Sequence, residues 1–146
     1  MATESLNTWN EIRDGAGDVE RMIGHKQYNL AMIRARQTLE LMVKSLCDRY
    51  RLSGADLSEK IDVLYKNRII TKTTAEHYHK IRMIGNRAAH EGDDNATGAN
   101  TAYHLLSQEL YTFANDFNSR RPAPRNSGRK SSSKQTRGNS FFDGLN

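Results

Sequence analysis

Apolar side chains recur at intervals of three and four residues through the first 118 residues, and no proline interrupts them. This spacing places the apolar side chains on one side of successive α-helices. Proline breaks a helix interior, and both prolines, Pro122 and Pro124, come later. No stretch alternates apolar and polar residues as a strand does. The sequence therefore predicts an all-α fold, an antiparallel helical bundle of four main helices plus a short helix.

The first helical segment is predicted to begin at Thr8, whose side chain forms a capping box with Glu11, and to end at Gly24. Its apolar residues form one stripe with a 3-4-3-4 spacing. Two glycines inside it, Gly15 and Gly17, each lower the stability of the helix by about 1 kcal/mol relative to alanine. We expect a helix that depends on packing against the rest of the bundle.

The second segment, near residues 26–51, is the longest and is apolar over a broad face, which favours a place in the middle of the bundle. On its flank Arg36 and Glu40 are one helical turn apart and are predicted to form a structural ion pair. Cys47 is expected in or near the core. Because it is the single cysteine, an internal disulfide is excluded, which fits a reducing compartment.

Three more helices follow. The first two begin at a polar residue with a glutamate three residues on, which is the arrangement of a capping box. A turn over residues 92–95 precedes the last helix, whose apolar stripe has a 4-3-4-3-4 spacing. The predicted starts are Asp56 for the short helix, Thr73 for the fourth helix, which runs to about His90, and a point before Ala99 for the fifth, which extends to Phe117.

Charge divides the chain at Asn118. Residues 119–146 contain seven basic and one acidic side chain, whereas residues 1–118 contain 15 basic and 16 acidic ones. The final segment is rich in Arg, Ser, Lys, Gly and Asn, so it cannot bury enough apolar surface to offset the entropy lost on ordering. We predict a folded domain over residues 1–118 and a disordered basic tail over residues 119–146.

The tail is the predicted contact for RNA or another polyanion, because flexible basic segments bind phosphates without sequence preference and with strong salt dependence. The alternative is a solubilising tail that has no ligand. Near its end, Phe141 and Phe142 form a candidate docking motif for a protein partner. The basic side chains of the tail are Arg120, Arg121, Arg125, Arg129, Lys130, Lys134 and Arg137.

Other classes of protein are disfavoured. The longest apolar run, residues 30–33, is far shorter than the ~20 residues of a membrane span, and no signal peptide is visible. His77 and His79 point about 200° apart on a helix, so they cannot share a metal ion. No glycine-rich phosphate loop is present either. We expect a soluble, cytoplasmic protein that uses no metal and no cofactor.

The residues best suited to chemistry lie on the fourth helix. Arg82, Asn86 and His90 recur every four residues and fall along one slowly drifting stripe. Arginine can hold a phosphate bidentately, asparagine can hydrogen-bond to it, and histidine can move a proton near neutral pH. Gly85 leaves the helix slender, so that another helix or a ligand can approach closely. The stripe therefore suits a phosphodiester substrate.

A structural role for the same residues is the alternative. Arg82 could form an ion pair with Glu40 or Glu91, and His90 could act as a cation at the C-terminal end of the helix, where positive charge is favoured. In that case the stripe fastens helices together and binds no substrate.

Two blocks of the sequence resemble bacterial domains of unknown function in the HEPN (higher eukaryotes and prokaryotes nucleotide-binding) superfamily. They are Arg-Ala-Arg-Gln-Thr-Leu-Glu at residues 34–40 and Ile-Arg-Met-Ile-Gly-Asn-Arg-Ala-Ala-His-Glu at residues 81–91. The resemblance spans roughly residues 15–118. It implies a helical bundle that is frequently a homodimer, with the motif helices facing each other across the two-fold axis. Many relatives are metal-independent ribonucleases of toxin–antitoxin, CRISPR or phage-defence systems.

The nuclease motif of these relatives is an arginine followed, after four to six residues, by a histidine, often with a polar residue directly after the arginine. Asn86 and His90 stand at the polar and histidine positions, and Gly85 stands where the arginine would be. Arg82 is one turn earlier. The resemblance implies that Arg82 clamps the phosphate, Asn86 orients it and His90 serves as acid or base.

Two hypotheses follow. In the first, the chain is an RNA-binding module and a metal-independent ribonuclease of a bacterial stress or phage-defence system, acting as a homodimer. In the second, it is a non-catalytic module for protein interaction or dimerisation. The nuclease requires Arg82, Asn86 and His90 to be open to solvent in a cleft, whereas the interaction module requires them to be buried and satisfied. If Gly85 lies at the dimer interface, Gly85→Glu should favour monomers.

Overall fold

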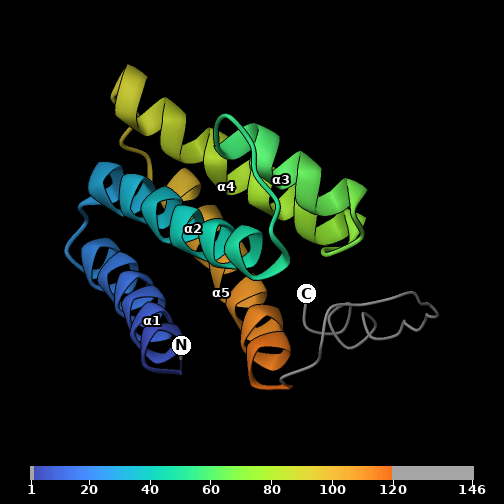
Figure 1. Cartoon of the computed structure of the whole chain (residues 1–146). Helices are drawn as coiled ribbons and strands as arrows, with labels where there is room; N and C mark the ends of the chain where they lie inside the picture. The colour runs from blue at the N-terminus through green and yellow to red at the C-terminus, as the bar shows by residue number, and fades with distance from the viewer. Residues whose placement is uncertain (1, 120–146) are drawn as a thin grey trace. The chain divides into compact units, whose positions relative to one another are not determined.

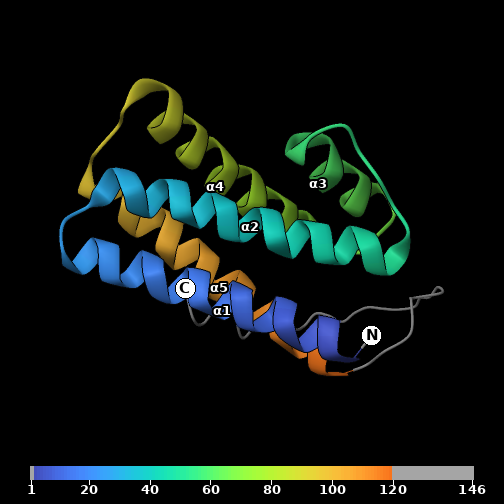
Figure 2. The ribbon, with the colours of Figure 1, turned by 60° about the vertical axis from the view of Figure 1, so that its left-hand side comes forward.

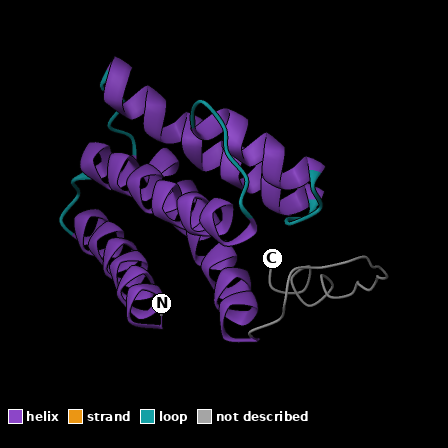
Figure 3. Cartoon of the chain, viewed as in Figure 1, coloured by secondary structure: helices purple, strands orange, loops and turns teal. Residues whose placement is uncertain are grey.

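The helical spacing of the sequence is realised as five helices. The computed structural model describes residues 2–119. Figure 3 shows helices and connecting loops, and no strand, in this part of the chain, which confirms the all-α prediction. The helices are α1 (Ala2–Gly24), α2 (Tyr28–Tyr50), α3 (Leu57–Lys66), α4 (Lys72–Glu91) and α5 (Ala96–Ser119). The chain divides into two units after Tyr111, and the packing below is that of the first.

The predicted cap of α3 is confirmed, and two other predicted starts are wrong. The Asp56 carboxylate accepts a hydrogen bond from the Glu59 N–H at 2.9 Å. Helix α1 begins at Ala2 and passes through Thr8, because neither glycine nor proline precedes Thr8 to stop it. Helix α4 is capped by Thr71 and not by Thr73, because the Thr71 side chain accepts the Thr74 N–H at 3.1 Å, and Thr74 itself is buried.

Helix α2 lies between α1 and α4, as Figures 1 and 2 show from two directions. A helix in this position must be apolar on more than one side, which is what the broad apolar face of the sequence predicts. Its fully or almost fully buried residues are Ala31, Met32, Ala35, Thr38, Leu39, Met42, Val43, Leu46 and Cys47. Cys47 is therefore a core residue.

Gly15 gives α1 its close contact with α2. A Cβ atom at this position would overlap the Thr38 hydroxyl oxygen and would lie 3.2 Å from the Thr38 Cβ. The Thr38 hydroxyl is fixed, because it donates to the Arg34 carbonyl oxygen at 2.9 Å. Gly17 differs, since the nearest atom to a Cβ there is 3.9 Å away. The low helix propensity of Gly15 is thus offset by the close packing of α1 on α2 that it permits.

A polar clamp joins the beginning of α2 to the end of α4, so these helices run antiparallel. The Asn29 side-chain amide donates to the carbonyl oxygens of Ala88 at 2.8 Å and Asp93 at 2.6 Å. The Asp94 carboxylate accepts from the Asn29 backbone N–H at 2.8 Å. A negative charge is favourable at this helix N-terminus. The predicted turn at residues 92–95 is confirmed, with Gly92 in the left-handed conformation that glycine adopts readily.

The other two helices contact the α2–α4 pair. Helix α3 packs against both of them, and α5 begins beside α2, where a Cβ at Gly98 would lie 2.8 Å from the Met32 sulfur. Figure 1 shows the first turns of α5 behind α2. Among the described helices, none has the length and apolar character needed to cross a membrane.

Candidate functional site

The two sequence blocks that carry the HEPN resemblance meet where α2 packs against α4. One Arg36 terminal nitrogen donates to the Asn86 side-chain oxygen at 2.7 Å, and Arg36 Nε lies 3.7 Å from Glu40 Oε2. The predicted Arg36–Glu40 ion pair is thus confirmed. Arg36 Nε is buried without a hydrogen-bond partner among the described residues. We call this contact, made by Met32, Arg36, Gly85 and Asn86, the seam.

Gly85 determines how closely the two helices approach at the seam. A Cβ here would lie 2.5 Å from the Arg36 Cβ and 3.0 Å from the Met32 carbonyl oxygen. Gly85 is buried, and its place is against α2 of the same chain. The expectation that Gly85→Glu would act at a dimer interface is therefore wrong: a side chain at this position first separates α2 from α4.

Arg82 lies toward α3. Its Nε donates to His79 Nδ1 at 3.2 Å, and His79 Nε2 is 2.9 Å from Asp62 Oδ1. Because Nδ1 accepts a hydrogen bond, the histidine carries its proton on Nε2, which donates to Asp62. The structural alternative, in which Arg82 pairs with Glu40 or Glu91, is wrong about the partner. It is right that Arg82 bonds to another side chain.

The structure does not bring Arg82, Asn86 and His90 together at one point. The stripe drifts around α4. Arg82 therefore bonds to His79 on the side of α4 that faces α3, whereas Asn86 bonds to Arg36 of α2. His90 is exposed in the last turn of α4 and makes no hydrogen bond or ion pair with another residue of the described chain. The first two side chains each bond to a protein partner, and only the third has no partner in the described chain.

His90 lies on the outward side of α4 with several other exposed residues, and we call four of them the open face: Lys80, Met83, Arg87 and His90. Sequence reasoning did not select Lys80 or Arg87. The signal was present, because residues spaced 3-4-3 along a helix fall on one side of it. The stripe that sequence reasoning did select follows a spacing of four and drifts off this side.

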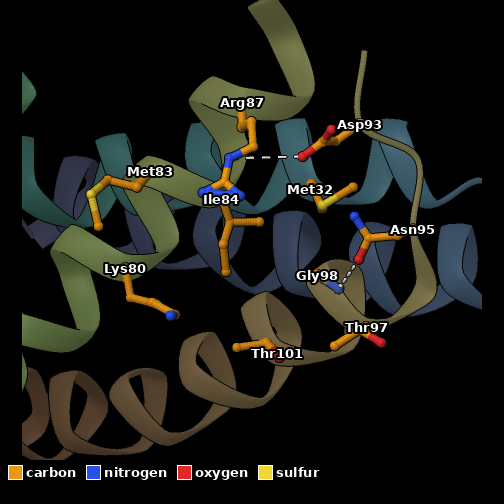
Figure 4. Close-up of a pocket in the computed structure, with 10 residues that line it drawn as sticks. All are labelled: Met32, Lys80, Met83, Ile84, Arg87, Asp93, Asn95, Thr97, Gly98 and Thr101. Atoms are coloured by element: carbon orange, nitrogen blue, oxygen red, sulfur yellow. Dashed lines mark hydrogen bonds and ion pairs between the residues drawn. The ribbon is translucent and has the colours of Figure 1, made fainter. Parts of the chain in front are cut away.

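Part of the open face borders a pocket between α4 and the start of α5, shown in Figure 4. Met32 is only 1% exposed and makes the inner wall apolar together with Ile84. Figure 4 shows Lys80 and Arg87 reaching over the pocket from different turns of α4. The complete lining is Met32, Lys80, Met83, Ile84, Arg87, Asp93, Asn95, Thr97, Gly98 and Thr101.

The seam, the open face and the pocket all lie within residues 18–115, which match the model of a family described as a domain of unknown function. The chain belongs to the DUF4145 family. The match covers about two thirds of the chain. No curated protein and no solved structure matches it.

The DUF4145 domain also contains a buried carboxylate that sequence reasoning missed. The Glu109 side chain is 3% exposed and accepts hydrogen bonds from the Thr74 hydroxyl at 2.9 Å and from His77 Nδ1 at 2.7 Å. His77 thus bonds to α5, whereas His79 bonds to Asp62 of α3. The prediction that the two histidines cannot share a metal is consistent with these separate partners. Within residues 2–119 no three His, Cys, Asp or Glu side chains form a group that could hold a metal ion.

Cys47 of this DUF4145 domain is 3% exposed and sits in the core. Burial raises the pKa of its thiol, and the positive charge of Lys60 opposes this only in part. A thiol with a raised pKa is a poor nucleophile, because the thiolate is the reactive form. Cys47 is therefore a packing residue.

The predictions for the tail lie outside the described residues. They concern the order of residues 120–146, the seven basic side chains and the Phe141–Phe142 motif.

Proposed function

We propose that this DUF4145 domain is an RNA-binding module of the HEPN type, and that the open face of α4 contacts RNA phosphates. The observation that carries the proposal is the cluster of Lys80, Arg87 and His90, all exposed on one side of one helix. Lys80 and His90 have no hydrogen-bond or ion-pair partner in the described chain. Residues 1–118 carry a net charge of −1, and the exposed Glu76 and Glu91 stand before and after the open face, so the positive charge is confined to the positions between them.

The chemistry of the open face suits a chain of phosphates. Lysine and arginine neutralise phosphate charge, and histidine can donate a hydrogen bond to a phosphate oxygen. Lys80 and His90 are ten residues apart, which is about 15 Å along the helix axis. This length lets α4 contact more than one phosphate of the same strand. The pairing of Arg36 with Asn86 supports the HEPN relation, because it joins the two blocks on which the resemblance rests.

The tail and a second copy of the chain belong to the same proposal. The seven basic residues between Arg120 and Arg137 add affinity that does not depend on RNA sequence. In a HEPN-type homodimer the two α4 helices face each other, so two open faces form one longer binding surface. A role in bacterial stress or phage defence, with a partner protein, follows from the same resemblance.

Metal-independent RNA cleavage is a second candidate function, and the exposed imidazole of His90 favours it. A histidine in this state can act as acid or base. Arg82 and Asn86 would contribute the nitrogens that their protein partners leave unused. The third candidate, a non-catalytic interaction module, is favoured by the seam, where Asn86 is already satisfied by Arg36.

The test measures binding of labelled total RNA to the full chain across a range of salt concentrations. We expect the combined variant Arg87→Ala/His90→Ala to bind more weakly and to show a smaller salt slope, by roughly 0.7–0.9 for each phosphate that is no longer neutralised. Lys72→Glu lies about two turns before Lys80 on the same helix and should weaken binding by no more than its change in charge predicts. An unchanged slope in the double variant would contradict the proposal.

Cleavage is tested on the same RNA with a chelator present. If His90 transfers a proton, His90→Ala should slow cleavage by about 10²-fold or more. RNA that stays intact with the wild-type protein would eliminate the ribonuclease and leave the binding module. Sedimentation of the full chain at several concentrations tests the homodimer.

A further inference from the structure

The pocket beside α4 has an inner wall that suits a flat, apolar ring. Ile84 presents an aliphatic group and the exposed Met83 a thioether, and thioethers make favourable contacts with aromatic rings. Met32 lies behind this wall: it is 1% exposed, and a Cβ at Gly98 would lie 2.8 Å from its sulfur, so α5 covers it. The pocket holds about 220 Å³, less than the ~300–1,000 Å³ of pockets for larger ligands. A single base is a ligand of suitable size.

The rim of the pocket is polar and carries one net positive charge. Lys80 has no partner in the described chain, and Arg87 forms only a loose ion pair, with its Nε 3.8 Å from Asp93 Oδ2. The Arg87 side chain is 59% exposed, so its terminal nitrogens are accessible. Across the pocket, Thr97 and Thr101 of α5 supply hydroxyl groups. A phosphodiester has one negative charge, which matches the charge of this rim.

We propose that the pocket binds one unpaired nucleotide of single-stranded RNA. The base packs against Ile84 and Met83, and the adjoining phosphate lies between Lys80 and Arg87. Asp93 stays paired with Arg87 at the edge. This inference rests on the proposed function and adds the class of RNA that the domain selects.

Duplex RNA does not fit the pocket. A base within a duplex is stacked and paired, and extracting it costs a few kcal/mol. Single strands present unstacked bases directly, so a base can enter the pocket and contact Ile84 and the Met83 thioether. The open face can bind the phosphates of either form, but the pocket accepts only a free base.

The experiment uses the full chain and a fluorescent 16-nucleotide RNA, presented as a single strand and as the duplex with its complement. We expect the wild type to bind the single strand more tightly. Thr101→Trp places a ring in the pocket and should weaken single-strand binding about tenfold, near the upper end of the range for one thioether–ring contact. Duplex binding should not change. Thr101→Ser keeps the hydroxyl, adds no ring to the pocket and is the matched control.

A second variant covers the case in which Thr101→Trp does not fold. Lys80 is exposed, so Lys80→Glu should leave the melting temperature unchanged and weaken single-strand binding more than Lys72→Glu does. If the chain binds neither RNA, the proposed function falls, and this inference falls with it. If it binds both equally and neither pocket variant reduces single-strand binding, the pocket proposal alone is overturned.

Discussion

The two sides of α4 use polar residues in opposite ways. At the seam, Asn86 and Arg36 bond to each other across two helices, and Gly85 has no side chain. On the open face, Lys80 and His90 have no partner within the described chain. A polar residue that bonds to protein serves the stability of the fold, whereas one without a partner remains available to a ligand. The sequence block at residues 81–91 contains both kinds.

The largest effect is expected from a methyl group at the seam. Gly85→Ala places a Cβ 2.5 Å from the Arg36 Cβ, so α2 and α4 must separate. Overpacking costs about 1–3 kcal/mol or more, and the gain of about 1 kcal/mol in helix propensity does not offset a contact with backbone atoms. We expect a net loss of about 2 kcal/mol in urea unfolding.

Gly17→Ala is the matched control for Gly85→Ala. Its Cβ would meet no atom closer than 3.9 Å, so the substitution should increase stability by up to about 1 kcal/mol. Equal effects of the two substitutions would show that the seam is not tightly packed.

The next effect concerns the hydrogen bond at the seam. Asn86→Ala leaves the partly buried Arg36 guanidinium with one partner fewer, which should cost about 1–3 kcal/mol. Asn100→Ala removes an exposed asparagine from α5 and should stay within about 0.5 kcal/mol. Both are measured by thermal and urea unfolding. If the two asparagines cost the same, the Arg36–Asn86 bond contributes no net stability.

A smaller effect depends on pH and concerns Cys47 in the core. Burial raises the pKa of this thiol, so the folded state keeps a proton that the unfolded chain loses above about pH 8.5. The contribution of Cys47 to stability is therefore complete below that pH and falls as the pH rises through the folded-state pKa. Between about pH 8 and 10, wild type should lose more stability than Cys47→Ala, by at most about 1.4 kcal/mol per pH unit. Parallel pH profiles would contradict this.

The smallest effect on stability is expected on the open face. His90→Ala removes an exposed side chain without a protein partner, so the free energy of unfolding should change by no more than about 0.5 kcal/mol. Its effect should appear in RNA binding instead. A loss of 1 kcal/mol or more would place His90 among the structural residues and would remove the contrast between the two sides.

Helical spacing was sufficient to predict the fold because the positions that it selects, such as Ile12, Leu39 and Ile81, are fully buried. The start of α1 was missed because Thr8 can cap a helix only if the residues before it are not helical. No residue before Thr8 breaks the helix, which begins at Ala2. The seam was out of reach for another reason. Arg36 and Asn86 are 50 residues apart, and spacing within one helix does not reveal which helix packs against it.

The pocket could not be predicted from spacing either. It depends on the path of the loop at residues 92–95, which brings the first turn of α5 beside Lys80 and Ile84. That path is fixed by Asn29, more than 60 residues away, through its bond to the Asp93 carbonyl oxygen. The open face was predictable in principle, and only the choice of a four-residue spacing concealed it.

The central place of α2 also has a consequence for the order in which the protein folds. Its contact with α1 is local, because residues 25–27 connect the two helices, whereas the seam closes a loop of about 50 residues. Local contacts form more readily, so the α1–α2 hairpin should assemble early and the seam late. Substitutions at a late contact accelerate unfolding and leave the folding rate nearly unchanged. The seam would then set the lifetime of the folded molecule, which stopped-flow measurements on Gly85→Ala and Gly15→Ala can compare.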